Sequence, residues 1–228
     1  IDVLWLRLSR RTDDPPQTLG RVDAGHVFVM LNRGTYWQCA FVIRKSGFDA
    51  LRAQGLPAFR AIIARLSPPL RDRVDELADW SDVSLLTVTV DRLKRWHRPG
   101  LLCIGDAAHA MSPIGGVGIN LAIQDAVAAA NILAPVLRRG APTEADLQAV
   151  QKRRAWPTAM TQRAQVLIQN HVISRVLAGA GGGPLPWQIR LLQHFPYLRR
   201  IPARLVGIGV RPEHVRLPPA DGAAHTDG

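Results

Sequence analysis

The chain has 228 residues, of which 47% are hydrophobic and 21% charged, so its composition is that of a globular protein and excludes a disordered one. Its 29 lysines and arginines against 18 acidic residues give a formal net charge of +11. All but three of these basic residues are scattered arginines, and no basic helix is interleaved with aromatic residues, which argues against nucleic-acid binding.

The sequence also bears on location. No run of about twenty apolar residues is free of charge, which disfavours a membrane span, and no secretory leader is found. The two cysteines, Cys39 and Cys103, lie in apolar strand-like runs. We therefore expect free thiols in a cytoplasmic protein that contacts a membrane peripherally at most.

The first ninety residues predict an antiparallel sheet with a helical insert. Alternation predicts strands at 3–8, 27–31 and 36–44, and Gly34 marks a hairpin turn between the last two. A helical period follows up to Leu66, Pro68 and Pro69 end that helix, and a second one is expected through Leu77. A β-branched strand is predicted at 83–91.

The rest of the chain predicts one strand and several helices. We expect a buried strand at 101–104, a helix over 117–134, and a capping box of Thr143 and Asp146 that opens another helix. Pro157 is expected to end or kink that helix, and a further one continues to about Leu177. Residues 178–183 read as a linker, the apolar and arginine-rich tail 184–215 is expected to pack on the protein, and the last dozen residues read as disordered.

The passage from Leu101 to Ala134 carries the chemistry. An apolar run stops at Gly105 and Asp106, passes through a glycine-rich turn, and restarts as a helix. A carboxylate at the end of a strand can accept hydrogen bonds from sugar or polyol hydroxyls, and a helix start offers unpaired N–H groups to an electron-rich partner. Glycines let the backbone approach a planar ring. The pattern indicates a cofactor-facing loop and contains no metal ligands.

The segment "GDAAHAMSPIGGVGINLAIQDA", residues 105–126, closely resembles the second flavin-binding motif of class A flavoprotein monooxygenases, the para-hydroxybenzoate hydroxylase-like family. The resemblance implies that Asp106 binds a ribityl hydroxyl of FAD and that Pro113 lies beside the isoalloxazine. It further implies that backbone N–H groups near the start of the helix face the flavin N1/C2 carbonyl. The implied cofactor-binding residues are Gly105, Asp106, Pro113, Gly115, Gly116, Gly118, Ile119 and Asn120.

Simpler interpretations stay open for several of these residues. Asp106 can serve as a turn former, and Asn120 as a plain helix cap. His109 either orients the loop by hydrogen bonds or touches the cofactor, and Asp125 is interpreted as structural. In the hairpin, Tyr36, Trp37 and Gln38 are candidate substrate contacts, but alternation puts Tyr36 and Gln38 on one face and Trp37 on the other. No catalytic acid or base is assigned.

The fold expected from the resemblance is α/β. It combines an α+β substrate sheet with part of an FAD/NAD(P)-binding Rossmann-like domain and C-terminal helices. The expected domains are residues 1–97 for substrate binding, 98–140 for the C-terminal part of the FAD-binding domain, and 141–228 for helices and tail. The amino-terminal G-x-G-x-x-G and the middle Asp-Gly motif of the family are missing. The chain is therefore expected to be a carboxyl-terminal half that lacks the N-terminal βαβ unit.

The function implied is hydroxylation of a small aromatic or lipophilic substrate by FAD, NAD(P)H and O₂ through a flavin C4a-hydroperoxide. Two alternatives remain. One is another flavoprotein oxidoreductase of the same superfamily, although the Trp-x-Trp-x-Ile-Pro signature of flavin halogenases is absent. The other is an inactive chain that only binds a partner, for which the missing N-terminal flavin-binding half is the candidate.

Overall fold

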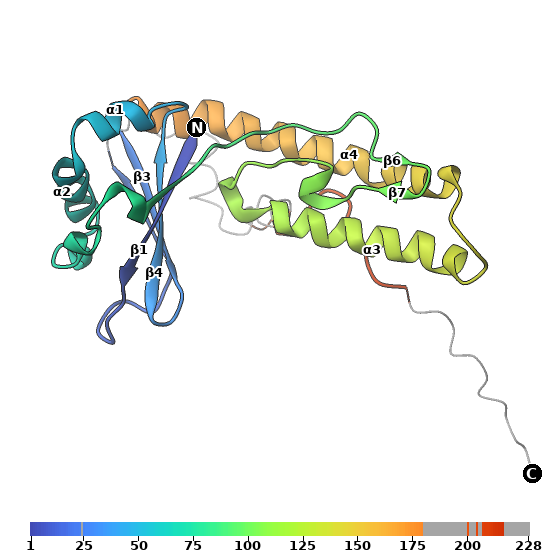
Figure 1. Ribbon diagram of the computed structural model, residues 1–228, viewed down its shortest axis with the longest axis horizontal. Coiled ribbons are helices and arrows are strands. Elements are labelled where there is room, and N and C mark those ends of the chain that lie inside the picture. Colours follow the sequence, from blue (N-terminus) through green and yellow to red (C-terminus); the bar gives the residue numbers. More distant parts are fainter. Residues whose placement is uncertain (24, 180–199, 201–203, 205–206, 217–228) are drawn as a thin grey trace, which may run out of the picture. The chain divides into compact units, whose positions relative to one another are not determined.

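The computed structural model describes residues 1–23, 25–179, 200, 204 and 207–216 (Figure 1). Two compact units divide the chain. Unit 1 comprises residues 1–88 and 166–187, and unit 2 comprises residues 89–165 and 188–228. Most of the tail, with the expected linker beyond residue 179 and the last dozen residues, lies outside the described residues.

Unit 1 is built on a five-stranded antiparallel sheet in the order β2-β3-β4-β1-β5. Its strands are β1 (Asp2–Ser9), β2 (Leu19–Asp23), β3 (His26–Asn32), β4 (Tyr36–Ile43) and β5 (Val83–Leu86). The predicted hairpin is confirmed, because β3 pairs with β4 across a turn in which Gly34 has φ +82°. A positive φ is open to glycine at little steric cost.

Two strands differ from prediction. The unpredicted β2 is a mostly exposed edge strand, so it lacks the apolar alternation that reveals the others. The strand expected at 83–91 ends at Leu86. Beyond it, the Val88 N–H donates to the Asp2 carboxylate at 3.0 Å, and the Val88 carbonyl accepts from Lys45 at 2.8 Å. The side chains of Asp2 and Lys45 thus form the hydrogen bonds with the Val88 backbone that a neighbouring strand would otherwise form.

Helices cover one face of this sheet (Figure 1). Alternate residues of β1, β3 and β4 form a core with α1 (Phe48–Ala53) and α2 (Leu56–Leu66), in which Phe41 meets Phe59 edge-to-face at 5.2 Å. The prediction of a second helix from Leu70 through Leu77 is wrong. The chain instead makes short 3-10 turns, Pro68–Leu70 and Val74–Glu76. Only a few residues separate Pro69 from Leu77, and an isolated helix that short is marginal.

Unit 2 contains two long helices, α3 (Gly118–Leu137) and α4 (Glu144–Ile168), and a two-stranded antiparallel ladder of β6 (His97–Arg98) and β7 (Leu101–Leu102). The capping box at the start of α4 is confirmed. The Asp146 N–H donates to Thr143 Oγ1 at 3.3 Å, and the Thr143 N–H donates to Asp146 Oδ2 at 2.8 Å. Helix α4 runs on through Pro157, so the expectation that the helix ends there is wrong, while a kink at Pro157 stays a prediction. The buried Arg154 and Thr158 anchor this stretch by tertiary packing, which outweighs the local cost of proline.

The buried strand predicted at 101–104 is wrong. It shrinks to the two residues of β7, and Leu101 is 54% exposed. A buried strand of a parallel sheet needs neighbours on both sides. Within the described residues β7 pairs with β6 alone.

The two compact units meet in the chain after residue 88 and again after residue 165. Residues 89–97 group with unit 2, where the Trp96 ring lies 5.2 Å from that of His109. Residues after 165 group with unit 1, where α5 (Ser174–Leu177) follows a π-helical turn, Gln169–Ile173. There the carbonyls of Val176 and Leu177 accept from the Gly25 N–H and the Arg44 guanidinium, each at 3.0 Å.

By length and composition, α3 is also the one helix in the described part of the chain that could cross a membrane. This is weak evidence, because core helices of folded domains pass the same test. The fully buried Asp125 of α3 makes an ion pair with Arg154 of α4, which is typical of a helix packed inside a domain.

Candidate cofactor site

The candidate site follows β7 and ends in the first turn of α3. A 3-10 turn, Gly105–Ala107, and a second one, Ile114–Gly116, lead into the helix. Gly105 is buried, and Asp106, Gly115, Gly116 and Ile119 are exposed. Pro113, Gly118 and Asn120 are half-buried.

Gly105 is required by its surroundings. Its φ is +58°, and a Cβ built on it would lie 3.0 Å from the Cβ of Ala122 in α3. A side chain here would meet both the strain of the left-handed conformation and a close contact with the helix. The glycine therefore lets the turn that carries Asp106 lie directly against α3.

The later glycines differ among themselves. Gly115 and Gly116 have φ of +79° and +62°, so the turn before α3 needs residues that tolerate a left-handed backbone. Gly118 has no such φ, and a Cβ on it would make only an ordinary contact with Met111 at 3.5 Å. This contact concerns protein atoms alone, so the close approach of Gly118 to a cofactor ring stays a prediction.

The amino end of α3 has no side-chain cap among the described residues. Val117, which precedes the helix, makes no capping hydrogen bond, so it leaves the first N–H groups of this 20-residue helix without a cap. Asn120 is the third residue of α3, and its side chain donates to the Gly207 carbonyl at 3.1 Å, so it is not the helix cap. Asp106 has no hydrogen-bond partner among the described residues, which leaves its exposed carboxylate available.

A buried polar cluster supports this loop from behind. Asp125, fully buried in α3, accepts from the Gly105 N–H at 3.1 Å, contacts His109 Nε2 at 2.6 Å, and accepts from Arg154 Nε at 2.9 Å. Burial alone would raise the pKa of Asp125, but the hydrogen bonds from His109, Arg154 and Gly105 outweigh it and lower the pKa below its ordinary value. His109 thus orients the loop from a buried position.

Arg154 is the functional residue that sequence reasoning missed. Its guanidinium is 0% exposed and also donates to Gln124 at 3.1 Å and to the Arg211 carbonyl at 3.0 Å. In the sequence Arg154 ends a basic run, Lys152–Arg154, shortly before Pro157, so nothing sets it apart from a solvated arginine. That run does not reveal a partner 29 residues away in the chain.

The hairpin candidates of unit 1 separate by face, as alternation predicts. Trp37 is fully buried in the core, where its Nε1 donates to Asp14 at 2.9 Å. Tyr36 and Gln38 are half-buried on the opposite face, and the Arg7 guanidinium lies 4.1 Å from the centre of the Tyr36 ring. Tyr36 borders a pocket of about 360 Å³ that is otherwise lined by Arg7, Ser9, Thr35, Glu76 and Asp82.

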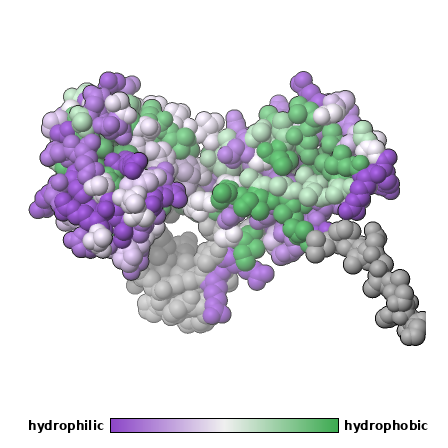
Figure 2. Space-filling view, turned by 60° about the horizontal axis from the view of Figure 1, so that its bottom comes forward, coloured by the Kyte–Doolittle hydropathy of each residue, from purple (hydrophilic) through white to green (hydrophobic). Residues whose placement is uncertain are grey.

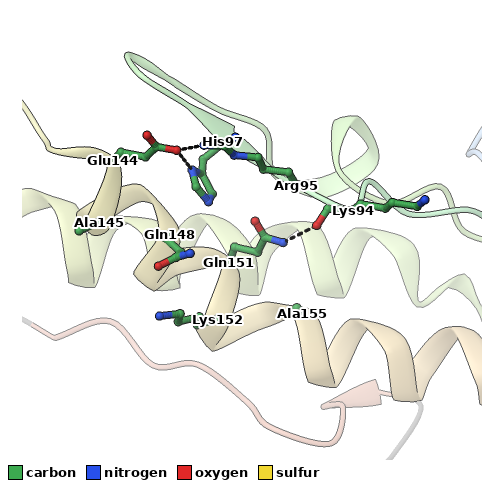
Figure 3. Close-up of a pocket in the computed structure, with 9 residues that line it drawn as sticks. All are labelled: Lys94, Arg95, His97, Glu144, Ala145, Gln148, Gln151, Lys152 and Ala155. Carbon is green, nitrogen blue, oxygen red and sulfur yellow. Dashed lines mark hydrogen bonds and ion pairs between the residues drawn. The ribbon is translucent and has the colours of Figure 1, made fainter.

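A pocket of about 570 Å³ in unit 2 lies between the segment before β6 and the first turns of α4 (Figure 3). Arg95 and His97 both approach the Glu144 carboxylate, His97 Nδ1 at 3.5 Å, and Gln151 donates to the Lys94 carbonyl at 3.0 Å. No residue of the flavin-like motif lines this pocket. It is therefore separate from the candidate cofactor loop.

Comparison with known proteins decides the family. The family model described as an FAD binding domain matches residues 24–164, more than half of the chain. The chain belongs to the class A FAD-dependent monooxygenase family. The resemblance inferred from the 105–126 motif is thereby confirmed.

Individual monooxygenases agree with this assignment. The 6-methylpretetramide 4-monooxygenase of Streptomyces rimosus is 38% identical over 174 residues, covering 76% of this chain and 41% of that protein. Kynurenine 3-monooxygenase of Xanthomonas euvesicatoria is 35% identical over 116 residues, covering 49% of this chain and 23% of that protein. The chain thus spans less than half the length of these curated relatives.

Solved structures show the same fold. PqsL of Pseudomonas aeruginosa matches with a TM-score of 0.60 at 21% identity, over 78% of this chain and 49% of that one. A flavin-dependent brominase matches with a TM-score of 0.59 at 19% identity, over 90% of this chain and 50% of that one. At these identities the likeness establishes fold alone, that of a mixed α/β chain covering about half of an FAD monooxygenase.

Proposed function

We propose that this chain is the substrate-side half of an FAD-dependent monooxygenase that uses NAD(P)H and O₂ to hydroxylate a small aromatic or lipophilic molecule. The observation that carries the proposal is the exposed carboxylate of Asp106, which has no partner among the described residues. It lies in the family's flavin motif, twelve residues before the first residue of α3. The carboxylate and the helix start offer an acceptor and a set of donors to one ligand.

The residues present fit FAD. Asp106 would accept a hydrogen bond from a ribityl hydroxyl, and Pro113 would flank the isoalloxazine. The N–H groups of Ile119 and Asn120, at the positive end of the α3 dipole, would favour negative charge at the flavin N1/C2 carbonyl. FAD when bound would supply the oxygen chemistry, while this chain binds and orients it. On this proposal unit 2 contributes to a Rossmann-like FAD domain.

For the substrate we infer a role for the Tyr36 and Gln38 face of the sheet. Tyr36 borders the pocket of unit 1 and offers a ring for stacking, and Gln38 offers an amide for hydrogen bonds. An aromatic or lipophilic substrate fits such a half-polar surface. We propose a cytoplasmic location, which the free thiols of Cys39 and Cys103 support.

A second candidate is that this chain is inactive alone and works only when bound to a complementary chain. It spans less than half of the curated relatives, and no G-x-G-x-x-G for pyrophosphate occurs in it. Helix α3 also presents an apolar surface (Figure 2), on which Ile119, Ile123 and Leu137 are 69%, 56% and 59% exposed. Such exposure on a helix is typical of an interface.

Titration with FAD, followed by flavin fluorescence, tests both candidates. The 228-residue chain alone is expected to bind FAD weakly and to show negligible NAD(P)H oxidation. The same chain supplied with the amino-terminal half of 6-methylpretetramide 4-monooxygenase is expected to become yellow. Submicromolar binding by the chain alone would overturn the dependence on a second half. Absence of binding in both preparations would overturn the FAD site itself.

A further inference from the structure

Residues 207–216, which we name the strap, are held along α3 by side chains of that helix. Asn120, Gln124 and Asn131 are spaced by four and seven residues, so they lie on one side of the helix. Their side-chain amides donate hydrogen bonds to three strap carbonyls, those of Gly207 at 3.1 Å, Ile208 at 2.7 Å and His214 at 2.8 Å respectively. In the other direction, the Arg216 N–H donates to Asn131 Oδ1 at 2.9 Å.

Glu213 of the strap is the first member of a series of charged side chains that contact one another. Glu213, whose side chain is 6% exposed, accepts from Arg153 Nε at 2.5 Å and lies 3.5 Å from Arg154 NH1. Arg154 in turn holds Asp125 at 2.9 Å. Asp125 accepts the Gly105 N–H at 3.1 Å, directly before Asp106. A continuous series of ion pairs and hydrogen bonds therefore joins the strap to the candidate flavin loop.

The geometry leaves these groups little freedom. Arg154 and Asp125 are fully buried, and the Arg154 guanidinium is shared among Asp125, Gln124, the Arg211 carbonyl and Glu213. A buried charged group that loses a hydrogen-bond partner is expected to move toward another, because a buried donor without an acceptor costs free energy. Loss of Glu213 is expected to let Arg154 shift and to loosen its hold on Asp125.

We propose that Glu213 and Arg154 are positioning residues for the cofactor loop, through which the strap holds the Gly105 turn in the form that binds flavin. This rests on the proposed FAD role of Asp106. Neither residue touches the cofactor in this scheme. Each acts through Asp125, so the effect of removing it appears as opening of the loop and weaker cofactor binding.

The test compares Glu213→Ala with the matched control Asn131→Ala. Asn131 also holds the strap against α3, but it has no part in the contacts that lead from Glu213 through Arg154 and Asp125 to Gly105. Hydrogen exchange is followed by mass spectrometry on peptides covering residues 104–113. FAD affinity is measured in the chain supplied with the amino-terminal half of 6-methylpretetramide 4-monooxygenase. Glu213→Ala is expected to speed exchange of these peptides, and to weaken FAD binding, by about 2- to 30-fold. Asn131→Ala is expected to change exchange only in residues 207–216.

Equal effects of the two variants on residues 104–113, or no effect of Glu213→Ala there, would overturn the proposal. If Glu213→Ala does not fold, Glu213→Gln removes the charge at nearly the same volume and decides the same comparison. Glu213→Asp, which keeps the carboxylate, should recover part of the protection. If the unsubstituted protein binds no FAD, the proposed function fails, while the exchange measurement still decides whether the strap positions the loop.

Discussion

Arg154 and Asp125 form an ion pair of 2.9 Å in which both side chains are 0% exposed, and this pair ties α4 to the back of the candidate flavin loop. Asp125 uses its second carboxylate oxygen for His109 and for the Gly105 N–H. Because Arg154 and Asp125 have no unsatisfied buried polar atom of their own, the pair favours one relative register of the two helices.

Replacing Arg154 with methionine should therefore be strongly destabilising, by about 3–5 kcal/mol, because it leaves a buried carboxylate without its cation. Chemical denaturation followed by circular dichroism measures this. Arg153→Met is the matched control. Arg153 is 30% exposed, so its ion pair with Glu213 is expected to contribute about 1 kcal/mol or less. Similar losses for the two variants would contradict the assigned role of Arg154.

Gly105→Ala should destabilise the protein more than Gly116→Ala. Both glycines have positive φ, and a Cβ there costs about 1–2 kcal/mol. Only at Gly105 does the added methyl also meet the helix, at 3.0 Å from Ala122 Cβ. Thermal unfolding of the single variants and of Gly105→Ala with Ala122→Gly gives the coupling between the two sites. A coupling of zero would show that the close contact is absent.

Asp106→Ala should weaken FAD binding by about 1.5–3 kcal/mol, or one to two decades in dissociation constant, through loss of a charge-assisted hydrogen bond. Equilibrium titration of the chain supplied with the amino-terminal half of 6-methylpretetramide 4-monooxygenase measures it. The free energy of unfolding without FAD should stay within about 0.5 kcal/mol, because Asp106 is exposed and has no partner among the described residues. Unchanged FAD affinity would make Asp106 a turn former only.

Asp14 should govern part of the acid sensitivity of unit 1. Its hydrogen bonds from the buried Arg73 guanidinium, at 2.5 and 2.9 Å, outweigh burial and hold its pKa far below the ordinary value near 3.9. A lowered pKa in the folded state means that the stabilisation is fully present above about pH 4 and is lost as the pH falls toward the folded pKa.

The free energy of unfolding of the unsubstituted chain and of Asp14→Asn, measured at pH 7, 4 and 3, tests this. The difference between the two proteins should be constant between pH 7 and about pH 5 and should shrink below pH 4. A difference that grows on acidification would show that the sign of the pKa shift is wrong.

Local features were predicted well from the sequence. Alternation placed β1, β3 and β4, and the faces of Trp37 and Tyr36, because successive side chains of a strand point to opposite sides. The start of α4 followed from Thr143 and Asp146, which are three residues apart. The flavin-like motif was recognisable for the same reason, since its glycines and acid lie within one continuous segment of the sequence, residues 105–118.

Only the tertiary structure decided which distant groups meet. Arg154 and Glu213 lie 29 and 88 residues after Asp125, and no local pattern pairs them. Tertiary packing likewise lets α4 continue through Pro157. Beyond Leu86, the Asp2 carboxylate accepts the backbone hydrogen bond that a neighbouring strand would otherwise accept. Neighbouring residues determine backbone conformation and the buried face of each element, because these depend on short-range sterics and periodicity. The register between elements, and so the positioning of the Gly105 turn, is set by contacts that exist only once the chain has folded.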